Sequence, residues 1–112
     1  GDIDEKVLLQ STYEFQLAKI LDVNDIKWIR PKVPFIWIDN KNIKHRYYPD
    51  FYLIDYNIYL DPKNDYGIKN DTEKIKKVIE QNNINLIILS KNQLNWVYIK
   101  NMLVSVNGRQ LV

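Results

Sequence analysis

A single stretch of this chain, YYPDFYLIDYNIYLDPK at residues 47–63, decides the fold that we expect. Aromatic-rich apolar runs at 51–53 and 58–60 lie on either side of Asp55-Tyr56-Asn57, and runs of this kind about turn-forming residues predict a β-hairpin. A hairpin closed at that turn brings Asp50 beside Asp61. Because side chains along a strand repeat every two residues, Asp61 and Lys63 share one face. The sequence therefore predicts two carboxylates and a lysine close together on one hairpin.

Taken one at a time, these residues have simpler explanations. An aspartate after Pro49 is typical of a turn, and Asp61-Pro62 is typical of a strand end, because Asp-Pro often initiates turns. These explanations do not account for the combined spacing, in which a Pro-Asp, a second acid and a lysine fall within one aromatic-rich segment. The combination favours a site for a metal ion and a phosphate.

The motif formed by Pro49, Asp50, Asp61, Pro62 and Lys63 resembles that of the PD-(D/E)XK nuclease superfamily. In that family a Pro-Asp opens one strand, and an acidic residue, any residue and a lysine lie near the end of the next. The resemblance implies that Asp50, Asp61 and the backbone carbonyl of Pro62 hold Mg²⁺, for which Mn²⁺ substitutes, and that Lys63 orients the nucleophile. The absence of cysteine and the single histidine argue against a Cys/His zinc site.

The motif departs from the usual family pattern at two positions. Asp61 stands where glutamate is commoner, and its side chain is shorter by one methylene. Pro62 offers a carbonyl but removes a ladder N–H, which is awkward in a central strand and easier at an edge, an end or a bulge. We therefore expect either that the strand ends at Pro62 or that the site is altered.

Glu14 is a candidate for a further carboxylate, because the active site of the resembled family often takes one from the first helix. A structural role competes with this one. Ser11 and Glu14 have the spacing of a capping box, in which Glu14 would bond back to the Ser11 N–H at the start of a helix. The two roles are compatible, and both remain open at this point.

The net charge of +2 is too small to indicate nucleic-acid binding, so the distribution of charge carries that argument. Basic residues before and after the motif form a rim that suits a phosphate backbone, and we expect DNA contacts from Lys41, Lys44, His45, Arg46 and Lys69. For His45, a phosphate contact or solvent exposure is a simpler account than a role as general base. Lys74, Lys76 and Lys77 are expected on a solvated helix face.

Periodicity predicts an α/β fold with the order α-β-β-β-α-β. This order is similar to the restriction-endonuclease-like core of the resembled superfamily, and the resemblance implies a central mixed sheet flanked by helices. The proposed strands 35–38, 43–48 and the hairpin of residues 47–63 form a meander, and a loop is expected at Asp65-Tyr66-Gly67. The second helix is expected to be capped by Asp71 or Thr72. The expected elements are a helix at 11–24, a short strand at 26–30, strands at 35–38 and 43–48, the hairpin, a helix to about 81 and a buried strand at 84–89.

The resemblance covers about residues 11–90, and residues 91–112 are expected to form a C-terminal extension. Within it, a helix at 92–103 would place Leu94, Val97, Tyr98 and Met102 inward, and Asn107-Gly108 is typical of a hairpin turn. A chain of 112 residues fits one domain, and the apolar Leu111-Val112 end fits a piece cut from a longer protein.

The sequence contains no apolar run near the ~20 residues of a membrane span and no signal-peptide pattern, so a bacterial or phage-infected cytoplasm is expected. The resemblance implies a Mg²⁺-dependent DNA endonuclease, acting as a homodimer where both strands are cut. The alternative is a catalytically degenerate nuclease-fold domain that serves DNA binding or assembly in a larger protein. A third possibility, an α/β interaction module, would have Asp50 and Asp61 pointing apart.

Overall fold

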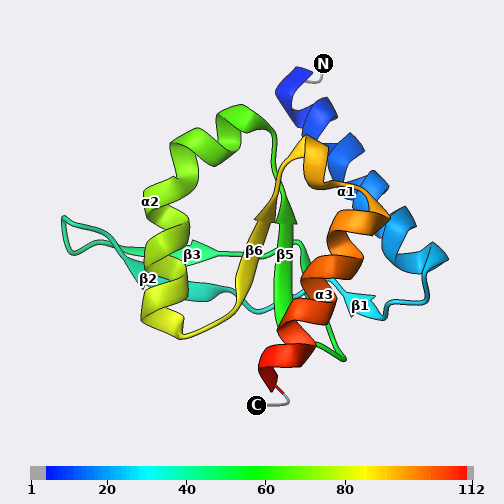
Figure 1. Cartoon of the computed structure of the whole chain (residues 1–112). Helices are drawn as coiled ribbons and strands as arrows, with labels where there is room; N and C mark the ends of the chain where they lie inside the picture. The colour runs from blue at the N-terminus through cyan, green and yellow to red at the C-terminus, as the bar shows by residue number, and fades with distance from the viewer. Residues whose placement is uncertain (1–4, 111–112) are drawn as a thin grey trace.

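Two β-sheets and three α-helices make up the computed structural model, which describes residues 5–110 (Figure 1). The α/β class is confirmed. In chain order the elements are α1 (Glu5–Val23), β1 (Trp28–Ile29), β2 (Phe35–Ile38), β3 (Lys44–Tyr47), β4 (Phe51–Leu53), β5 (Ile58–Pro62), α2 (Asp65–Asn82), β6 (Leu86–Leu89), a 3₁₀ turn (Lys91–Gln93) and α3 (Trp96–Gln110).

The larger sheet has four strands in the order β1-β4-β5-β6 and is mixed, as expected. Its β1–β4 and β4–β5 pairs are antiparallel, whereas β5 and β6 are parallel and joined through α2. The expected pairing of residues 35–38 with 43–48 is confirmed as β2 with β3. Its continuation into a meander is wrong, because β2 and β3 form a sheet of their own and β4 pairs with β1. Pro49, which lacks the N–H that a ladder needs, separates β3 from β4. Trp28 of β1 also packs on Phe51, with ring centroids 4.6 Å apart.

The β4–β5 hairpin has the register that the sequence predicts, with Phe51 opposite Leu60 and Tyr52 opposite Tyr59. Its turn closes through Asn57, whose φ of 53° lies in the left-handed region that asparagine tolerates better than most residues. Pro62 is the last residue of β5, a strand with a neighbour on each side. The ladder can accept proline there, and the Lys63 N–H then bonds to the Leu89 carbonyl at 2.9 Å. Of the two expectations for Pro62, the strand end is the one observed.

The sheet separates two hydrophobic clusters. On one face, α1 and α3 pack against alternate residues of the strands, and this cluster contains Leu17, Leu21, Phe51, Leu53, Ile58, Leu60, Leu89, Ile99 and Leu103. On the other face lie α2 and the β2–β3 hairpin, whose cluster contains Trp37, Tyr47, Ile75, Val78 and Leu86. Figure 1 shows α2 on the side of β5 and β6 away from α1. Because successive side chains of a strand point to opposite faces, β5 contributes Ile58 and Leu60 to the first cluster and Tyr59 to the second.

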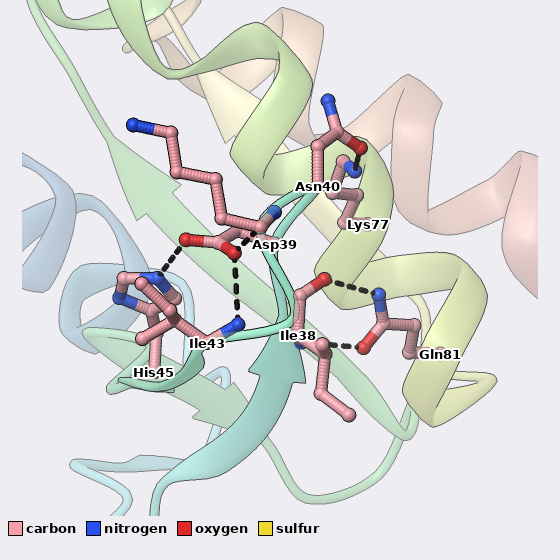
Figure 2. A network of polar contacts seen from close by, with 8 residues as sticks. Ile38, Asp39, Asn40, Ile43, His45, Lys77 and Gln81 are labelled. Atoms are coloured by element: carbon pink, nitrogen blue, oxygen red, sulfur yellow. Dashed lines mark hydrogen bonds and ion pairs between the residues drawn. The ribbon is translucent and has the colours of Figure 1, made fainter.

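The β2–β3 hairpin is attached to α2 by polar contacts as well as by its apolar face (Figure 2). The Gln81 side chain accepts from the Ile38 N–H at 2.8 Å and donates to the Ile38 carbonyl at 2.9 Å. Lys77 bonds to Asn40 in the hairpin turn. Oδ1 of Asp39 accepts from the N–H groups of Lys41 and Ile43 and so closes the turn. These contacts hold a two-stranded sheet that would be marginal by itself.

Two helix starts differ from the expected ones. α1 begins at Glu5, so Ser11 lies within the helix and the capping box at Ser11 and Glu14 is wrong. α2 begins at Asp65 because Asn64 caps it, with Oδ1 accepting from the Gly67 N–H at 2.7 Å. The expected loop at 65–67 and the cap at Asp71 or Thr72 are therefore wrong. The connection between β5 and α2 therefore consists of two residues, Lys63 and the cap Asn64.

The C-terminal segment also differs from expectation. α3 continues to Gln110, so a hairpin turn at Asn107-Gly108 is wrong, while Leu111-Val112 lie outside the described residues. Of the four residues expected inward, Leu94 and Met102 pack against the larger cluster, whereas Val97 is 70% exposed and Tyr98 39% exposed. The buried residues of α3 are Ile99 and Leu103. The helix begins four residues later than expected, at Trp96, and its inward face follows the spacing of three and four residues through Ile99, Met102, Leu103 and Val106. None of the helices between residues 5 and 110 has the length and apolarity needed to cross a membrane.

Candidate active site

Asp50 and Asp61 meet where the ends of β4 and β5 adjoin. Asp50 immediately precedes β4, and its backbone N–H donates to Oδ1 of Asp61 at 2.5 Å. Asp61 is 2% exposed, and it is the one charged residue among the fully described side chains that the fold buries. The Asp50 side chain is half-buried. Buried carboxylates need hydrogen bonds or cations around them, so the burial of Asp61 directs attention to its neighbours.

Glu14 reaches the same place from α1. Its negative charge acts on both Asp50 and Asp61 and raises the pKa of each. Oε2 of Glu14 also lies 3.5 Å from Nη2 of Arg30. A residue of the first helix therefore lies near the two strand carboxylates, and its role as a metal ligand stays a prediction.

The two aspartates have strongly shifted acidities. Burial, together with the charge of Glu14, raises the pKa of Asp50 to about 6, although the charges of Lys63 and Arg30 oppose the shift. Burial is also the main cause that raises the pKa of Asp61 to about 7, and the hydrogen bond from Asp50 and the charge of Lys63 oppose it. Nearby cations thus compensate the negative charge of the cluster only in part. Titratable groups perturbed in this way are enriched at functional sites.

Lys63 lies beside this cluster but its nearest ion-pair partner is another acid. Nζ of Lys63 is 3.5 Å from Oδ2 of Asp71 on α2, and the lysine side chain is 18% exposed. Lys74, also on α2, is 4.0 Å from the same Asp71 oxygen and lies over the Tyr47 ring, 5.4 Å from its centroid. Lys63 and Lys74 both lower the pKa of Asp61 through their charge. Lys63 and Lys74 therefore place positive charge near the Asp61 carboxylate.

Sequence reasoning missed three residues of this site: Arg30, Asp71 and Lys74. Arg30 follows β1, so its approach to Glu14 depends on the pairing of β1 with β4. Asp71 was expected as a helix cap and Lys74 on a solvated helix face. The helical spacing of 71 and 74 indicates that they are neighbours on α2, but only the β5–α2 connection shows that this face turns toward Lys63.

The donor set suits a hard divalent cation. Glu14, Asp50 and Asp61 offer carboxylate oxygens, which Mg²⁺ and Mn²⁺ prefer. Among the described side chains, no group of three acidic, His or Cys residues is arranged as a ready-made metal centre. Two carboxylates are nevertheless enough, because Mg²⁺ is usually held by one or two of them together with water and substrate phosphates.

The residues expected to contact nucleic acid lie on two separate elements. Lys41 is exposed in the β2–β3 turn, and Lys44 and Arg46 are exposed on one face of β3. His45, on the other face, stacks on Trp37 with ring centroids 4.4 Å apart, and its Nε2 lies 2.7 Å from Oδ2 of Asp39 (Figure 2). Lys69 is exposed on α2. The hairpin thus groups four of the five residues, and for each of them the nucleic-acid contact stays a prediction.

The centre of the site consists of Asp50, Asp61, Glu14 and Lys63, and Arg30, Asp71 and Lys74 lie around it. Comparison of the chain with protein-family models, curated proteins and solved structures gives no match. The function of the site is therefore inferred from its residues and their geometry alone.

Proposed function

We propose that this chain is a metal-dependent DNA endonuclease of the PD-(D/E)XK type with a restriction-endonuclease-like core. The observation that carries the proposal is the contact between Asp50 and the buried Asp61 at the end of a mixed sheet, with Glu14 and Lys63 near enough to act on both acids through their charges. A buried carboxylate such as Asp61, with two further acids near it, costs stability unless a cation compensates it, so its presence favours a function over a purely structural role.

In the proposed reaction Asp50 and Asp61 would hold the cation, Glu14 would add a further negative charge near it, and the Pro62 carbonyl lies at the end of the same strand as Asp61. When bound, Mg²⁺ or Mn²⁺ supplies charge neutralisation at the phosphate and lowers the pKa of a coordinated water. Lys63 orients the attacking water and places a positive charge near the phosphate. The hydrogen bond from the Asp50 N–H fixes the direction of the Asp61 carboxylate.

DNA would approach over the exposed cations of the β2–β3 hairpin. Lys44 and Arg46 point outward from β3, next to Ile36 and Ile38 across the strand pair. Contacts of this kind position the backbone without reading its sequence. The proposed substrate is therefore defined by the phosphodiester at the carboxylates, and the proposed cellular setting is a bacterial or phage-infected cytoplasm.

The alternative is a nuclease-fold domain that has kept the architecture and lost the chemistry. It is favoured by two contacts, since Asp61 already accepts from the Asp50 N–H and Lys63 pairs with Asp71 rather than with the carboxylates. Such a domain would bind DNA or assemble within a larger protein. The two proposals differ in one measurable respect, which is phosphodiester cleavage.

The test is nicking of supercoiled plasmid and cleavage of a branched DNA with Mg²⁺ or Mn²⁺. We expect metal-dependent cleavage by the wild type and its loss in Asp61→Asn and Lys63→Met. The matched controls are Asp55→Asn, in the exposed turn of the same hairpin, and Lys100→Met, exposed on α3. Cleavage by the controls that is lost in both site variants supports the nuclease. Absence of cleavage by the wild type, or cleavage that survives both site variants, favours the non-catalytic domain.

A further inference from the structure

A groove between the segment that follows β1 and the β4–β5 hairpin has three aromatic rings in its lining. It has a volume of about 410 Å³ and lies between the 31–34 loop and the rings of Phe35, Tyr52 and Tyr59. The Tyr52 and Tyr59 rings are tilted, with centroids 4.7 Å apart, and Phe35 meets Tyr59 edge to face at 5.0 Å. Tyr52 and Tyr59 are only partly buried, so their rings are accessible from the groove. Its size is within the range of small-ligand pockets.

The position of this groove relative to the carboxylates follows from the strand register. Tyr52 lies two residues after Asp50, and Tyr59 two residues before Asp61. Because Tyr52 is paired with Tyr59, the two rings form the next row of side chains along the same face of the hairpin. Two residues of a strand span roughly 7 Å. One nucleotide can bridge a phosphate at the carboxylates and a base at the rings.

The rim of the groove carries positive charge. Lys32 lines it and is exposed, and Arg30, two residues earlier, pairs with Glu14 and lowers the pKa of Asp50 through its charge. The same loop therefore provides one cation at the carboxylates and another at the aromatic rings. A ligand with a planar apolar part and a negatively charged backbone suits this combination better than an uncharged peptide.

We propose that the Tyr52–Tyr59 groove receives an unpaired nucleobase next to the scissile phosphate, so that the substrate class is DNA with unpaired bases. The inference rests on the proposed nuclease function and adds a subsite to it. A base inside a continuous duplex cannot reach the rings without leaving its stack, which costs a few kcal/mol. Branched, flapped or single-stranded DNA does not carry that cost. Stacking on aromatic rings tolerates any base, so sequence preference is not expected here.

The test measures binding rather than cleavage. Fluorescence anisotropy without divalent metal compares a thymidine dodecamer with a twelve-residue abasic oligonucleotide, which has the same charge and no bases. We expect the wild type to bind the thymidine oligonucleotide about tenfold more tightly, which corresponds to the stacking of one base. Tyr52→Leu with Tyr59→Leu should lose this preference and keep the weaker backbone binding. Tyr52→Phe retains the ring and should keep the preference, as should Tyr98→Leu on α3.

Equal affinities of the wild type for the two oligonucleotides would overturn the subsite, as would no binding of either. A preference that survives in the double variant would also overturn it, and the groove would then suit a protein partner. The thermal midpoint of each variant shows whether it is folded, and the wild-type comparison of the two oligonucleotides keeps the test valid if the double leucine variant is not. Loss of base preference in a protein that still nicks plasmid would reject this inference alone, whereas base preference without nicking would reject only the proposed activity.

Discussion

The backbone N–H of Asp50 donates a 2.5 Å hydrogen bond to Oδ1 of Asp61, and this contact joins the start of β4 to the end of β5. It places the two acids of the motif against each other in a region that excludes most water, since Asp61 is 2% exposed. Because burial favours the protonated acids, the site stores an electrostatic cost that a proton or a cation removes. The first two predictions follow from this cost.

The stability of the metal-free protein should fall as pH rises from about 5 to about 8. The folded-state pKa values, about 6 for Asp50 and about 7 for Asp61, lie above the ordinary value of 3.8. The folded state therefore binds more protons than the unfolded state in this window, and its advantage is lost as each acid ionises. For Asp61 alone the loss is roughly 2 to 3 kcal/mol.

Urea denaturation in EDTA at the two pH values measures this difference, and Asp61→Asn should flatten the profile and be more stable than the wild type near pH 8. Asp55→Asn, a substitution at an exposed turn residue, should keep the slope. An unchanged slope in Asp61→Asn would show that other groups cause the pH dependence.

Divalent metal should stabilise the folded protein most where the acids are ionised. Mn²⁺ and protons compete for the same carboxylate oxygens, so the increase in thermal midpoint should be larger near pH 8 than near pH 5. Calorimetric titration with Mn²⁺ should give weaker binding for Asp50→Ala and Asp61→Ala than for Asp55→Ala. Affinity that is the same in all three variants would count against the ligand assignment.

Loss of the Asp71 charge should affect the nicking rate, through the position of Lys63, more than it affects the free energy of unfolding. The Lys63–Asp71 contact is 3.5 Å long and partly exposed, so Asp71→Asn should cost less than about 1 kcal/mol of unfolding free energy. As a positioning residue for the lysine, its loss should lower the nicking rate about tenfold. The pH profile of nicking should also shift, because the charge next to the Lys63 ammonium changes.

Rescue by Asp71→Glu, which keeps the charge, distinguishes positioning from a merely structural role. The matched control is Glu73→Gln, an exposed acid on the same helix, which should leave the nicking rate and its pH profile unchanged. Nicking by Asp71→Asn at the wild-type rate would mean that Lys63 does not depend on this contact.

The β2–β3 hairpin should contribute to DNA affinity through charge alone. Lys44→Ala and Arg46→Ala remove exposed cations, so each should weaken binding to unrelated DNA sequences to a similar degree. The slope of log K against log salt should become shallower by about one unit for each lost phosphate contact. Lys19→Ala on α1 serves as the exposed-lysine control. An unaltered salt dependence in both hairpin variants would remove this hairpin from the DNA-binding surface.

The sequence alone predicted the elements whose pattern is local. The β4–β5 hairpin has the expected turn and register because apolar alternation and Asn57 act over a few residues. The apolar run at 84–89 is largely a strand, and the helix through Leu17 and Leu21 is present. The start of α2 was misplaced because its cap is Asn64, and Asp71 looks equally suitable when only the sequence is considered.

The residues of the candidate site also fall into two groups, those that local spacing predicts and those that only tertiary contacts bring together. Spacing along the hairpin predicted that Asp50, Asp61 and Lys63 meet, because a period of two residues places them relative to one another. The family resemblance, rather than any pattern, pointed to Glu14. Arg30 and Asp71 could not be predicted from spacing, since each reaches the site through a contact between elements distant in the chain.

The sequence by itself determined the hairpin, its turn and the face that Asp61 and Lys63 share, since each follows from alternation and turn preference over fewer than about ten residues. Only the tertiary structure decided that β4 pairs with β1 while β2 and β3 form a separate sheet. The same packing turned Asp71 toward Lys63 and left the Tyr52–Tyr59 groove open. The physical reason is that pairing and packing between distant segments depend on which apolar faces bury each other best. A local sequence pattern does not specify which of several possible partners a segment will pack against.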